Sequence, residues 1–266
     1  MTDTQTKPVL LVRATGNEAD ASALAELGIA SVTEPYLEIR TVPGAEGYQA
    51  ATDLLAKMTA LANGDWVIVT SVNGLKHWGI LYGQANLATA LSAAQDRGVK
   101  FAAIGETSAA MYSTLGIHPV LIASAPYGGI LAQEVLAATD GLPHRALIPT
   151  GNLAMAQLRE TLLQAGWGVD SVVVYQTSSV VDRPTSASAL VTGDFSLVIL
   201  RSPSAARALL QHGGVSTVPV ICGGNTTADA ARDLGLRVVA VAEATDPASM
   251  AQTVQRVLFD LNRGVA

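Results

Sequence analysis

Glycines and small polar residues recur in this sequence where short apolar runs end. A Gly-X-Thr-(Ser/Thr)-Ala pattern occurs twice, at residues 105–109 and 224–228, each time after an apolar run and before a short helical segment. Backbone N–H groups at such helix starts bind anions, and the positive end of the helix dipole adds to the attraction. The chemistry that these residues could do is hydrogen bonding to a ligand with several carboxylates.

The candidate binding residues share one position, the turn that follows a predicted strand. They are Arg13, Gly16, Asn17, Thr70, Ser71, Asn73, Gly74, Gly105, Thr107, Gly151, Asn152, Arg201, Ser202, Ser204, Gly224, Thr226 and Thr227. Ligands of open parallel sheets bind beyond the carboxyl ends of the strands. The ordinary role of Ser, Thr or Asn in such a turn is to cap the next helix, which stabilises it by about 0.5–2 kcal/mol. Capping and ligand binding are compatible, because a cap leaves other N–H groups unused.

Tyr175 is the candidate for proton chemistry. It ends the apolar run 172–174 and precedes the polar residues 176–179. One interpretation is a half-buried strand tyrosine whose hydroxyl lies at the sheet edge. The other is a hydroxyl that points into a cleft and donates a proton or hydrogen bond to a substrate.

Signals for other chemistry are absent from the sequence. There is no G-x-G-x-x-G after a strand, no phosphate-binding G-x-x-x-x-G-K-[ST] and no G-x-S-x-G nucleophile turn. His77, His118, His144 and His212 lack metal-ligand spacing, so packing or surface roles are expected. Cys222 is the only cysteine and is expected to be a small buried apolar residue. We therefore expect no metal site, and nucleotide binding has little support.

Composition narrows the class of protein further. The 266 residues are 49% hydrophobic and 14% charged, with 24 glycines, which favours buried parallel sheets over disorder. The net charge is −6 and no Lys/Arg cluster occurs, so nucleic acid is not an expected partner. Residues 1–7 are polar and no apolar run approaches about 18 residues, so a cytoplasmic protein without membrane contact is expected.

Short β-branched runs that alternate with Ala/Leu-rich segments must position these residues. The predicted strands are 9–12, 31–37, 66–70, 101–104, 119–122, 146–149, 171–176, 197–200, 218–222 and 237–241. The predicted helices include 18–27, 49–61, 154–164, 203–210 and 247–262. This alternation predicts an α/β fold of right-handed βαβ units with parallel sheets flanked by helices.

A longer internal repeat indicates two similar lobes. The order strand, Gly-Asn, helix, Gly, strand with Tyr occurs in residues 9–36 and again in residues 146–175. Two similar lobes imply a cleft between them. Five strands fall in each half, so two contiguous lobes fit. A chain that leaves the first lobe near Arg40 and returns near Thr177 fits equally well.

Five short motifs together resemble one known family. They are Val174-Tyr175-Gln176-Thr177, Thr70-Ser71-x-Asn73-Gly74, Ile104-Gly105-Glu106-Thr107, Ser202-Pro203-Ser204-Ala205 and Gly224-Asn225-Thr226-Thr227-Ala228. In this order and spacing they are similar to the uroporphyrinogen-III synthases, from residues 9–13 to residues 242–245. The resemblance implies two α/β lobes joined by a two-stranded connection. Lobe one would be residues 1–40 plus 178–266, and lobe two residues 41–177.

The resemblance also implies a reaction without a cofactor. Linear hydroxymethylbilane would be cyclised to uroporphyrinogen III, with loss of water and inversion of ring D. Tyr175 would assist the departure of hydroxide, and the strand-end groups would hold the acetate and propionate carboxylates. Arg13 and Arg201 would be charge partners, although Arg201 stands where the family often has a small polar residue. A monomer is implied, with a transient contact to the preceding pathway enzyme.

A rival interpretation is a two-lobed small-molecule binding or sensor protein without catalysis. It shares the expected cleft, but the DNA-binding helix-turn-helix or export signal that usually accompanies it is not evident. A nucleotide-dependent transferase is a weaker alternative, because a phosphate loop is missing.

Overall fold

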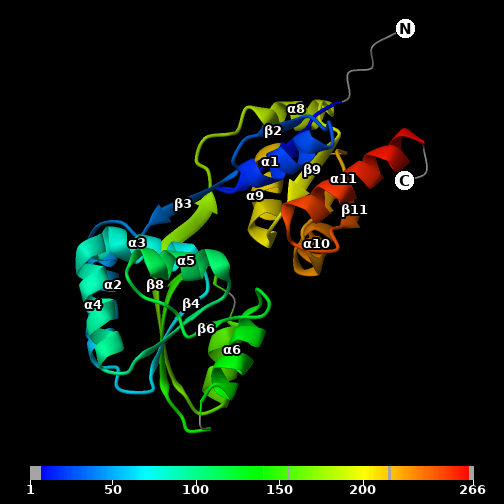
Figure 1. The fold of residues 1–266 in the computed structure, drawn as a ribbon. Coiled ribbons are helices and arrows are strands. Elements are labelled where there is room, and N and C mark those ends of the chain that lie inside the picture. The colour runs from blue at the N-terminus through cyan, green and yellow to red at the C-terminus, as the bar shows by residue number, and fades with distance from the viewer. Residues whose placement is uncertain (1–6, 140, 155, 215–216, 264–266) are drawn as a thin grey trace. The chain divides into compact units, whose positions relative to one another are not determined.

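The computed structural model describes residues 7–139, 141–154, 156–214 and 217–263. The chain divides into two compact units (Figure 1). Unit 1 comprises Met1–Glu38 and Ser178–Ala266, and unit 2 comprises Ile39–Thr177. Each unit is an α/β structure built on one sheet of mostly parallel strands, as expected from the alternation of apolar runs and helical segments.

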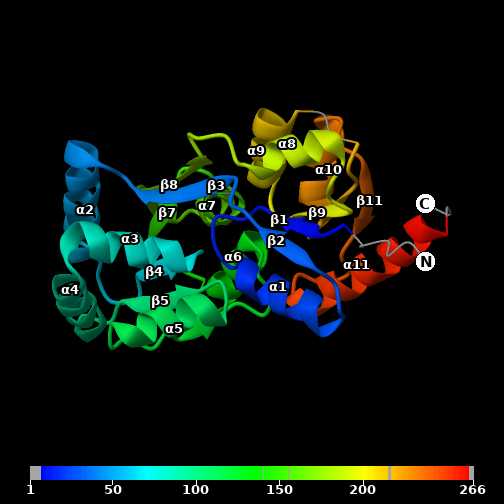
Figure 2. The same ribbon diagram turned by 90° about the horizontal axis from the view of Figure 1, so that it is seen from above.

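The sheet of unit 1 has the strand order β11-β10-β9-β1-β2, and its pairs are parallel. Its strands are β1 (Val9–Leu11), β2 (Ser31–Thr33), β9 (Leu197–Leu200), β10 (Val220–Cys222) and β11 (Val238–Val241). Its helices are α1 (Asn17–Glu26), α8 (Ser186–Thr192), α9 (Pro203–Gly213), α10 (Asn225–Asp233) and α11 (Pro247–Asn262). Helices α8, α9 and α10 cover one face, and α1 and α11 cover the other (Figure 2). The inner strands are therefore buried on both sides.

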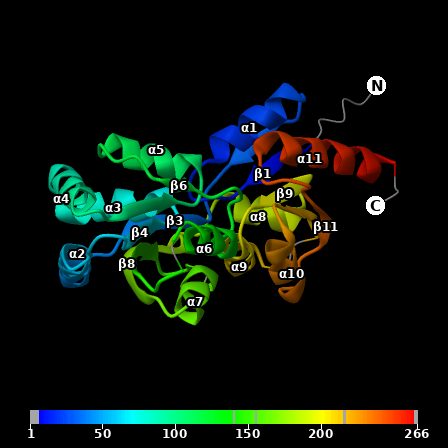
Figure 3. The ribbon, with the colours of Figure 1, turned by 60° about the horizontal axis from the view of Figure 1, so that its bottom comes forward.

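The sheet of unit 2 has the order β3-β8-β7-β4-β5-β6. Its strands are β3 (Leu37–Thr41), β4 (Trp66–Val69), β5 (Lys100–Ala103), β6 (Leu121–Ile122), β7 (Arg145–Gly151) and β8 (Gly168–Ser179). Its helices are α2 (Gly44–Thr59), α3 (Val72–Tyr82), α4 (Gln84–Asp96), α5 (Glu106–Thr114), α6 (Gly128–Ala137) and α7 (Gln157–Gln164). One core cluster lies under α2 to α5 and the other under α6 and α7 (Figure 3).

Strands β3 and β8 belong to both units, because each crosses the boundary between them. They are neighbours in the sheet. The backbone N–H of Val42 donates to Val174 O (3.1 Å), and that of Val180 donates to Tyr36 O (3.1 Å). Partner numbers rise on one strand as they fall on the other, so this pair is antiparallel. The chain thus passes out of unit 1 and back into it through two paired strands.

Several predicted elements differ in extent from those of the structure. The single strand expected at 31–37 is two strands, β2 and β3, separated by Glu34, Pro35 and Tyr36. The N–H groups on either side of Pro35 still donate to the β1 segment, from Glu34 to Leu11 O (3.0 Å) and from Tyr36 to Val12 O (3.1 Å). The change of partner comes at Tyr36, whose O accepts from the N–H of Val180 (3.1 Å). The helix expected at 49–61 begins earlier, at Gly44 directly after Pro43. The strand expected at 119–122 shortens to β6, although the N–H of Val120 also donates to Phe101 O of β5 (2.9 Å).

Candidate functional site

In unit 2, Tyr175 lies in β8 opposite Gly151 of β7, at a register shift between Thr150 and Gly151. A Cβ atom on Gly151 would lie 2.4 Å from Cε2 of the Tyr175 ring. Any residue other than glycine would therefore displace this ring. Gly151 makes room for the tyrosine, a role that its place in the sequence does not reveal.

A histidine ring stacks on the ring of Tyr175. The imidazole of His77, on α3, stacks on the phenol with ring centroids 5.4 Å apart and an interplanar angle of 29°. Nδ1 of His77 lies 2.8 Å from Oγ1 of Thr41 on β3. Burial, and secondarily the charge of Lys76, lowers the pKa of His77. The spacing of the histidines predicts only a packing or surface role for His77, and this contact is an additional finding.

The Tyr175 hydroxyl has no hydrogen-bond partner among the residues that the structure describes. The side chain is partly exposed. A buried tyrosine hydroxyl normally finds a partner within the protein. A partly exposed one without such a partner is free to donate to a ligand.

The backbone around Tyr175 is held by Asn152. Its N–H donates to Tyr175 O (3.2 Å). Its side chain accepts a hydrogen bond from the N–H of Thr177 (2.8 Å) and donates to Thr177 O (3.3 Å). The amide of Asn152 is thereby used within the protein. It fixes the strand on which Tyr175 lies.

The other candidates of unit 2 lie at the starts of α3 and α5. Ser71 caps α3, since its Oγ accepts a hydrogen bond from the N–H of Asn73 (3.2 Å). Gly74 allows α3 to approach β7, because a Cβ there would lie 2.6 Å from Pro149 O. Helix α5 starts after Gly105 without any side-chain cap, and Thr107 is exposed. The first N–H groups of α5 are therefore not bound by a capping side chain. Thr70 is partly exposed.

In unit 1, the turn after β1 is closed by Asn17. The side chain of Asn17 donates to Arg13 O (2.8 Å) and accepts from the N–H of Arg13 (3.2 Å). Gly16 adopts the left-handed conformation that this turn requires (φ 78°). The Arg13 guanidinium contacts Gly16 O at 3.4 Å and makes no ion pair with a described carboxylate. Burial lowers the pKa of Arg13. The negative charge of Asp20 partly opposes this decrease, and the positive charge of Arg201 adds to it.

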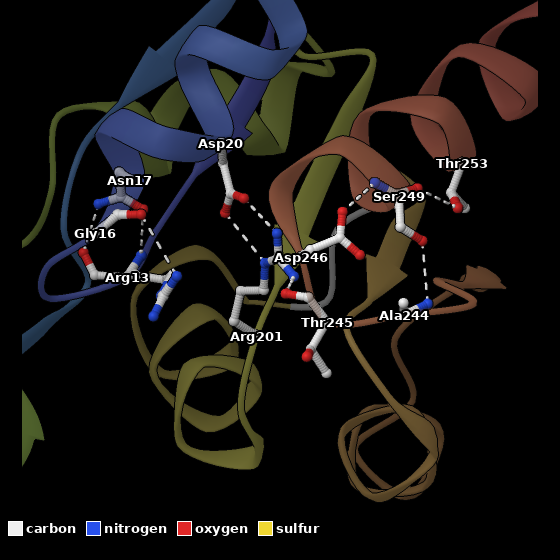
Figure 4. Close-up of polar contacts among 10 residues, drawn as sticks. All are labelled: Arg13, Gly16, Asn17, Asp20, Arg201, Ala244, Thr245, Asp246, Ser249 and Thr253. Carbon is white, nitrogen blue, oxygen red and sulfur yellow. Dashed lines mark hydrogen bonds and ion pairs between the residues drawn. The ribbon is translucent and has the colours of Figure 1, made fainter. Parts of the chain in front are cut away.

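Arg201 is occupied within unit 1 (Figure 4). Its guanidinium pairs with Asp20 of α1 through two contacts, of which Nε to Oδ2 measures 3.1 Å, and Nη1 donates to Thr245 O (2.8 Å). The two side chains are 8% and 1% exposed. The structure therefore uses Arg201 to join β9, α1 and the turn before α11. Of the two arginines expected as charge partners, only Arg13 keeps its charge unpaired.

The remaining candidates of unit 1 start α9 and α10. Ser202 caps α9 by accepting from the N–H of Ala205 (3.3 Å), and its Oγ lies 2.9 Å from that of Ser204. Helix α10 starts after Gly224 without a side-chain cap, as α5 does after Gly105. Thr226 is exposed, whereas Thr227 is buried. In both copies of the duplicated pattern, the helix thus starts directly after the first glycine and has no side-chain cap.

The described parts of the chain contain no group of three or more His, Cys, Asp or Glu side chains that could hold a metal ion. Nor does any helix in those parts have the length and apolar character needed to cross a membrane. Each unit has helix starts without a side-chain cap at the strand ends of its sheet; unit 1 also has the Arg13 guanidinium and unit 2 the Tyr175 hydroxyl. The fold defines the class, that of α/β proteins with two compact units.

Comparison with known proteins identifies the family. The sequence model of the family described as uroporphyrinogen-III synthase HemD matches residues 18–252. The chain belongs to this family. It is therefore an enzyme of tetrapyrrole biosynthesis that cyclises hydroxymethylbilane to uroporphyrinogen III, and not a binding protein without catalysis. No curated protein sequence matches the chain significantly.

Solved structures agree with this fold. The uroporphyrinogen-III synthetase of Helicobacter pylori is 17% identical, with a TM-score of 0.65 over 95% of this chain and 100% of that chain. A mutant uroporphyrinogen III synthase of Thermus thermophilus is also 17% identical, with a TM-score of 0.60 over 95% of this chain and 99% of that chain. At this identity the likeness describes the fold alone.

Proposed function

We propose that the Tyr175 hydroxyl assists the first step of the cyclisation, the departure of the substrate's hydroxyl group. The observation that carries this proposal is a partly exposed phenol whose hydroxyl has no partner among the described residues. Hydroxide is a poor leaving group unless a proton or hydrogen bond reaches its oxygen as the C–O bond breaks. The electron-rich pyrrole supplies the electron pair that expels it and becomes an azafulvene.

The later steps of the cyclisation require the enzyme to control the conformation of the bilane, and they need no nucleophile from the protein. The substituted carbon of ring D attacks the azafulvene, and the resulting spiro intermediate fragments and closes again with ring D reversed. The proton lost from the pyrrole carbon and the hydroxide released earlier together make the water that leaves. The bilane cyclises unaided to the other isomer, so the enzyme gains its selectivity by positioning.

We propose that the strand-end groups bind the acetate and propionate carboxylates. The uncapped starts of α5 and α10 offer N–H groups, and Arg13 offers an unpaired charge. The other proposed contacts are Thr70, Ser71, Asn73, Gly74, Thr107, Gly151, Asn152, Ser202, Ser204, Thr226 and Thr227. We further propose that the lobes of the enzyme are residues 1–40 plus 178–266 and residues 41–177. The compact units support this division.

The test is the Tyr175→Phe variant, assayed with hydroxymethylbilane and separation of the oxidised isomers. We expect kcat to fall by about 10²–10⁴-fold with little change in KM, since general acid assistance is worth that much. Tyr36→Phe is the matched control. Tyr36 is fully buried and its hydroxyl lies 3.0 Å from Ser186 Oγ, so its loss should affect stability and leave kcat unchanged. An unaltered kcat in Tyr175→Phe contradicts the proposed role.

We also propose that the enzyme works as a cytoplasmic monomer that takes its unstable substrate from a transient contact with the preceding enzyme. The single cysteine, buried Cys222, is compatible with a reducing compartment. Light scattering across a concentration series tests the monomer. A dimer at low concentration contradicts it.

A further inference from the structure

We infer that His77 is a positioning residue for Tyr175, which it holds by ring stacking while Thr41 fixes the imidazole. The inference rests on the role proposed above for Tyr175. It concerns a histidine that the reaction itself does not use.

The first support is the shape of the surroundings of Tyr175. The phenol lies against the His77 ring at a centroid distance of 5.4 Å. It also lies against Gly151, where a Cβ would be 2.9 Å from the phenol oxygen itself. Two surfaces, one from α3 and one from β7, thus limit where the hydroxyl can point. A misplacement of about 1 Å can cost a reaction up to about 10²-fold in rate.

The second support is the anchoring of the imidazole. His77 is 4% exposed, and its Nδ1 lies 2.8 Å from Thr41 Oγ1. A hydrogen bond at one ring nitrogen sets the rotation of the whole ring plane. Thr41 lies on β3, whose neighbour in the sheet is β8, the strand of Tyr175. The chain of contacts therefore runs from one strand through α3 to the next.

The third support is an unsatisfied atom. Nε2 of His77 is buried and has no hydrogen-bond partner among the described residues. A buried polar atom without a partner destabilises the fold by about 1–3 kcal/mol, and an apolar side chain would avoid this cost. The histidine offers what an aliphatic residue does not: a flat ring for stacking together with an anchor for that ring.

Unit 1 also contains a tyrosine–histidine pair, Tyr36 and His212, but its geometry is that of a packing contact. Tyr36 and His212 meet edge to face, at 6.0 Å and 80°. Nε2 of His212 lies 2.9 Å from Ser179 Oγ and 3.1 Å from Val180 O, and Tyr36 is fully buried. That pair is a satisfied packing contact. The stacked pair beside a free, partly exposed hydroxyl occurs in unit 2.

The experiment uses three variants of the full chain. His77→Leu removes the ring, His77→Phe keeps a ring without the anchor, and Thr41→Val removes the anchor alone. We expect His77→Leu to lower kcat by about tenfold, within the limit set by misplacement, with unchanged KM. His77→Phe should recover most of this loss. Thr41→Val should lower kcat less than His77→Leu, and it should have no effect in the His77→Phe background.

Two further measurements separate a positioning role from a general structural role. His77→Leu should not slow the Tyr175→Phe enzyme any further, because the hydroxyl that it positions is already absent. With ¹³C-labelled tyrosine, the Tyr175 signal, assigned through Tyr175→Phe, should shift in His77→Leu and return toward its original position in His77→Phe. Tryptophan fluorescence checks the folding of unit 2 in each variant.

The outcomes that overturn the inference are distinct from failure of the proposed function. If Tyr175→Phe is slow but His77→Leu keeps full kcat, positioning by His77 is wrong and the role of Tyr175 stands. The same holds if His77→Leu slows the Tyr175→Phe enzyme as much as the parent, or if the Tyr175 signal does not move. If Tyr175→Phe keeps full kcat, both proposals are wrong.

Discussion

Removing one partner of the Arg201–Asp20 pair should strongly destabilise unit 1. Asp20 is 1% exposed in its side chain and Arg201 is 8% exposed, so neither charge is solvated by bulk water. In Asp20→Asn, the guanidinium keeps its 2.8 Å hydrogen bond to Thr245 O but loses the carboxylate that neutralises it. Breaking a buried pair in this way costs about 3–5 kcal/mol.

That cost is large relative to the total stability of a domain, about 5–15 kcal/mol. With a urea dependence of about 2 kcal/mol per molar, the unfolding midpoint of unit 1 should fall by about 2 M. Replacing both partners by apolar residues, as in Asp20→Leu with Arg201→Met, should cost much less than the sum of the single changes. Neither charge is then left buried alone.

The assay can observe the two units separately. All three tryptophans, Trp66, Trp78 and Trp167, lie in unit 2, so their fluorescence follows that unit. Far-UV circular dichroism follows both. Asp20→Asn should therefore lower the midpoint of the dichroism transition while it leaves the fluorescence transition less affected.

The control is an exposed ion pair of unit 1. Arg232 and Asp229 are 55% and 71% exposed in their side chains, and their contact measures 3.0 Å. Asp229→Asn should cost no more than about 0.5 kcal/mol. Two results would refute the reasoning: an Asp20→Asn cost as small as that of this control, or a double variant whose cost equals the sum of its single changes.

Three more sets of variants probe the site and its surroundings. Gly151→Ala should lower kcat by up to about 10²-fold at similar KM, because the new Cβ would lie 2.4 Å from the Tyr175 ring; steady-state kinetics checks this, and an unchanged kcat contradicts it. Arg13→Met should raise KM by about 10–100-fold, the worth of about 1.5–3 kcal/mol for a charged hydrogen bond, with stability little changed. Arg13→Lys should rescue poorly, and an unaltered KM removes Arg13 from binding. Hydrogen bonding from Lys57, then from Arg145, lowers the pKa of Asp170 below 3.8 despite some desolvation. Its stabilisation is therefore present above the ordinary pKa and lost as pH falls through the lowered pKa, so Asp170→Asn should be less stable than the parent at pH 7, and the difference should shrink as the pH of the urea titrations is lowered.

The fold class could be predicted from the sequence because burial leaves a local pattern. A run such as residues 9–12 is apolar throughout, as expected for a strand covered on both faces, and the structure buries it completely. Element bounds were less accurate, as in the run 31–37, which divides between two strands. Local patterns locate elements well but locate their ends poorly.

The partners of the candidate residues could not be predicted, because they come from distant parts of the chain. Asp20 resembles an ordinary acidic residue in the first turn of a helix, yet it lies buried against Arg201. Gly223 likewise lies against a residue that is distant in the sequence, since a Cβ there would lie 3.2 Å from Arg201 Cδ. This close approach ties the Arg201 side chain to the turn that follows β10.

For His77 a local signal did exist. His77 follows Gly74 by three residues and Asn73 by four, so it shares their face of α3. A histidine on the same helical face as two candidate site residues is itself a candidate for the site. Spacing alone, however, does not say which ring it meets.

The position of β1 has a consequence for how the protein is made. β1 pairs with β2 on one edge and with β9 on the other. Because β9 follows unit 2 in the chain, the ribosome adds it only after the whole of unit 2 has been made. Unit 2 is continuous in the chain and can fold as soon as it has emerged. Until then Val9–Leu11, a completely apolar strand in the finished protein, has an open edge to which other nascent chains could pair. The order of synthesis therefore favours unit 2 as the first part to fold, with the earliest strand of the chain among the last to be completed.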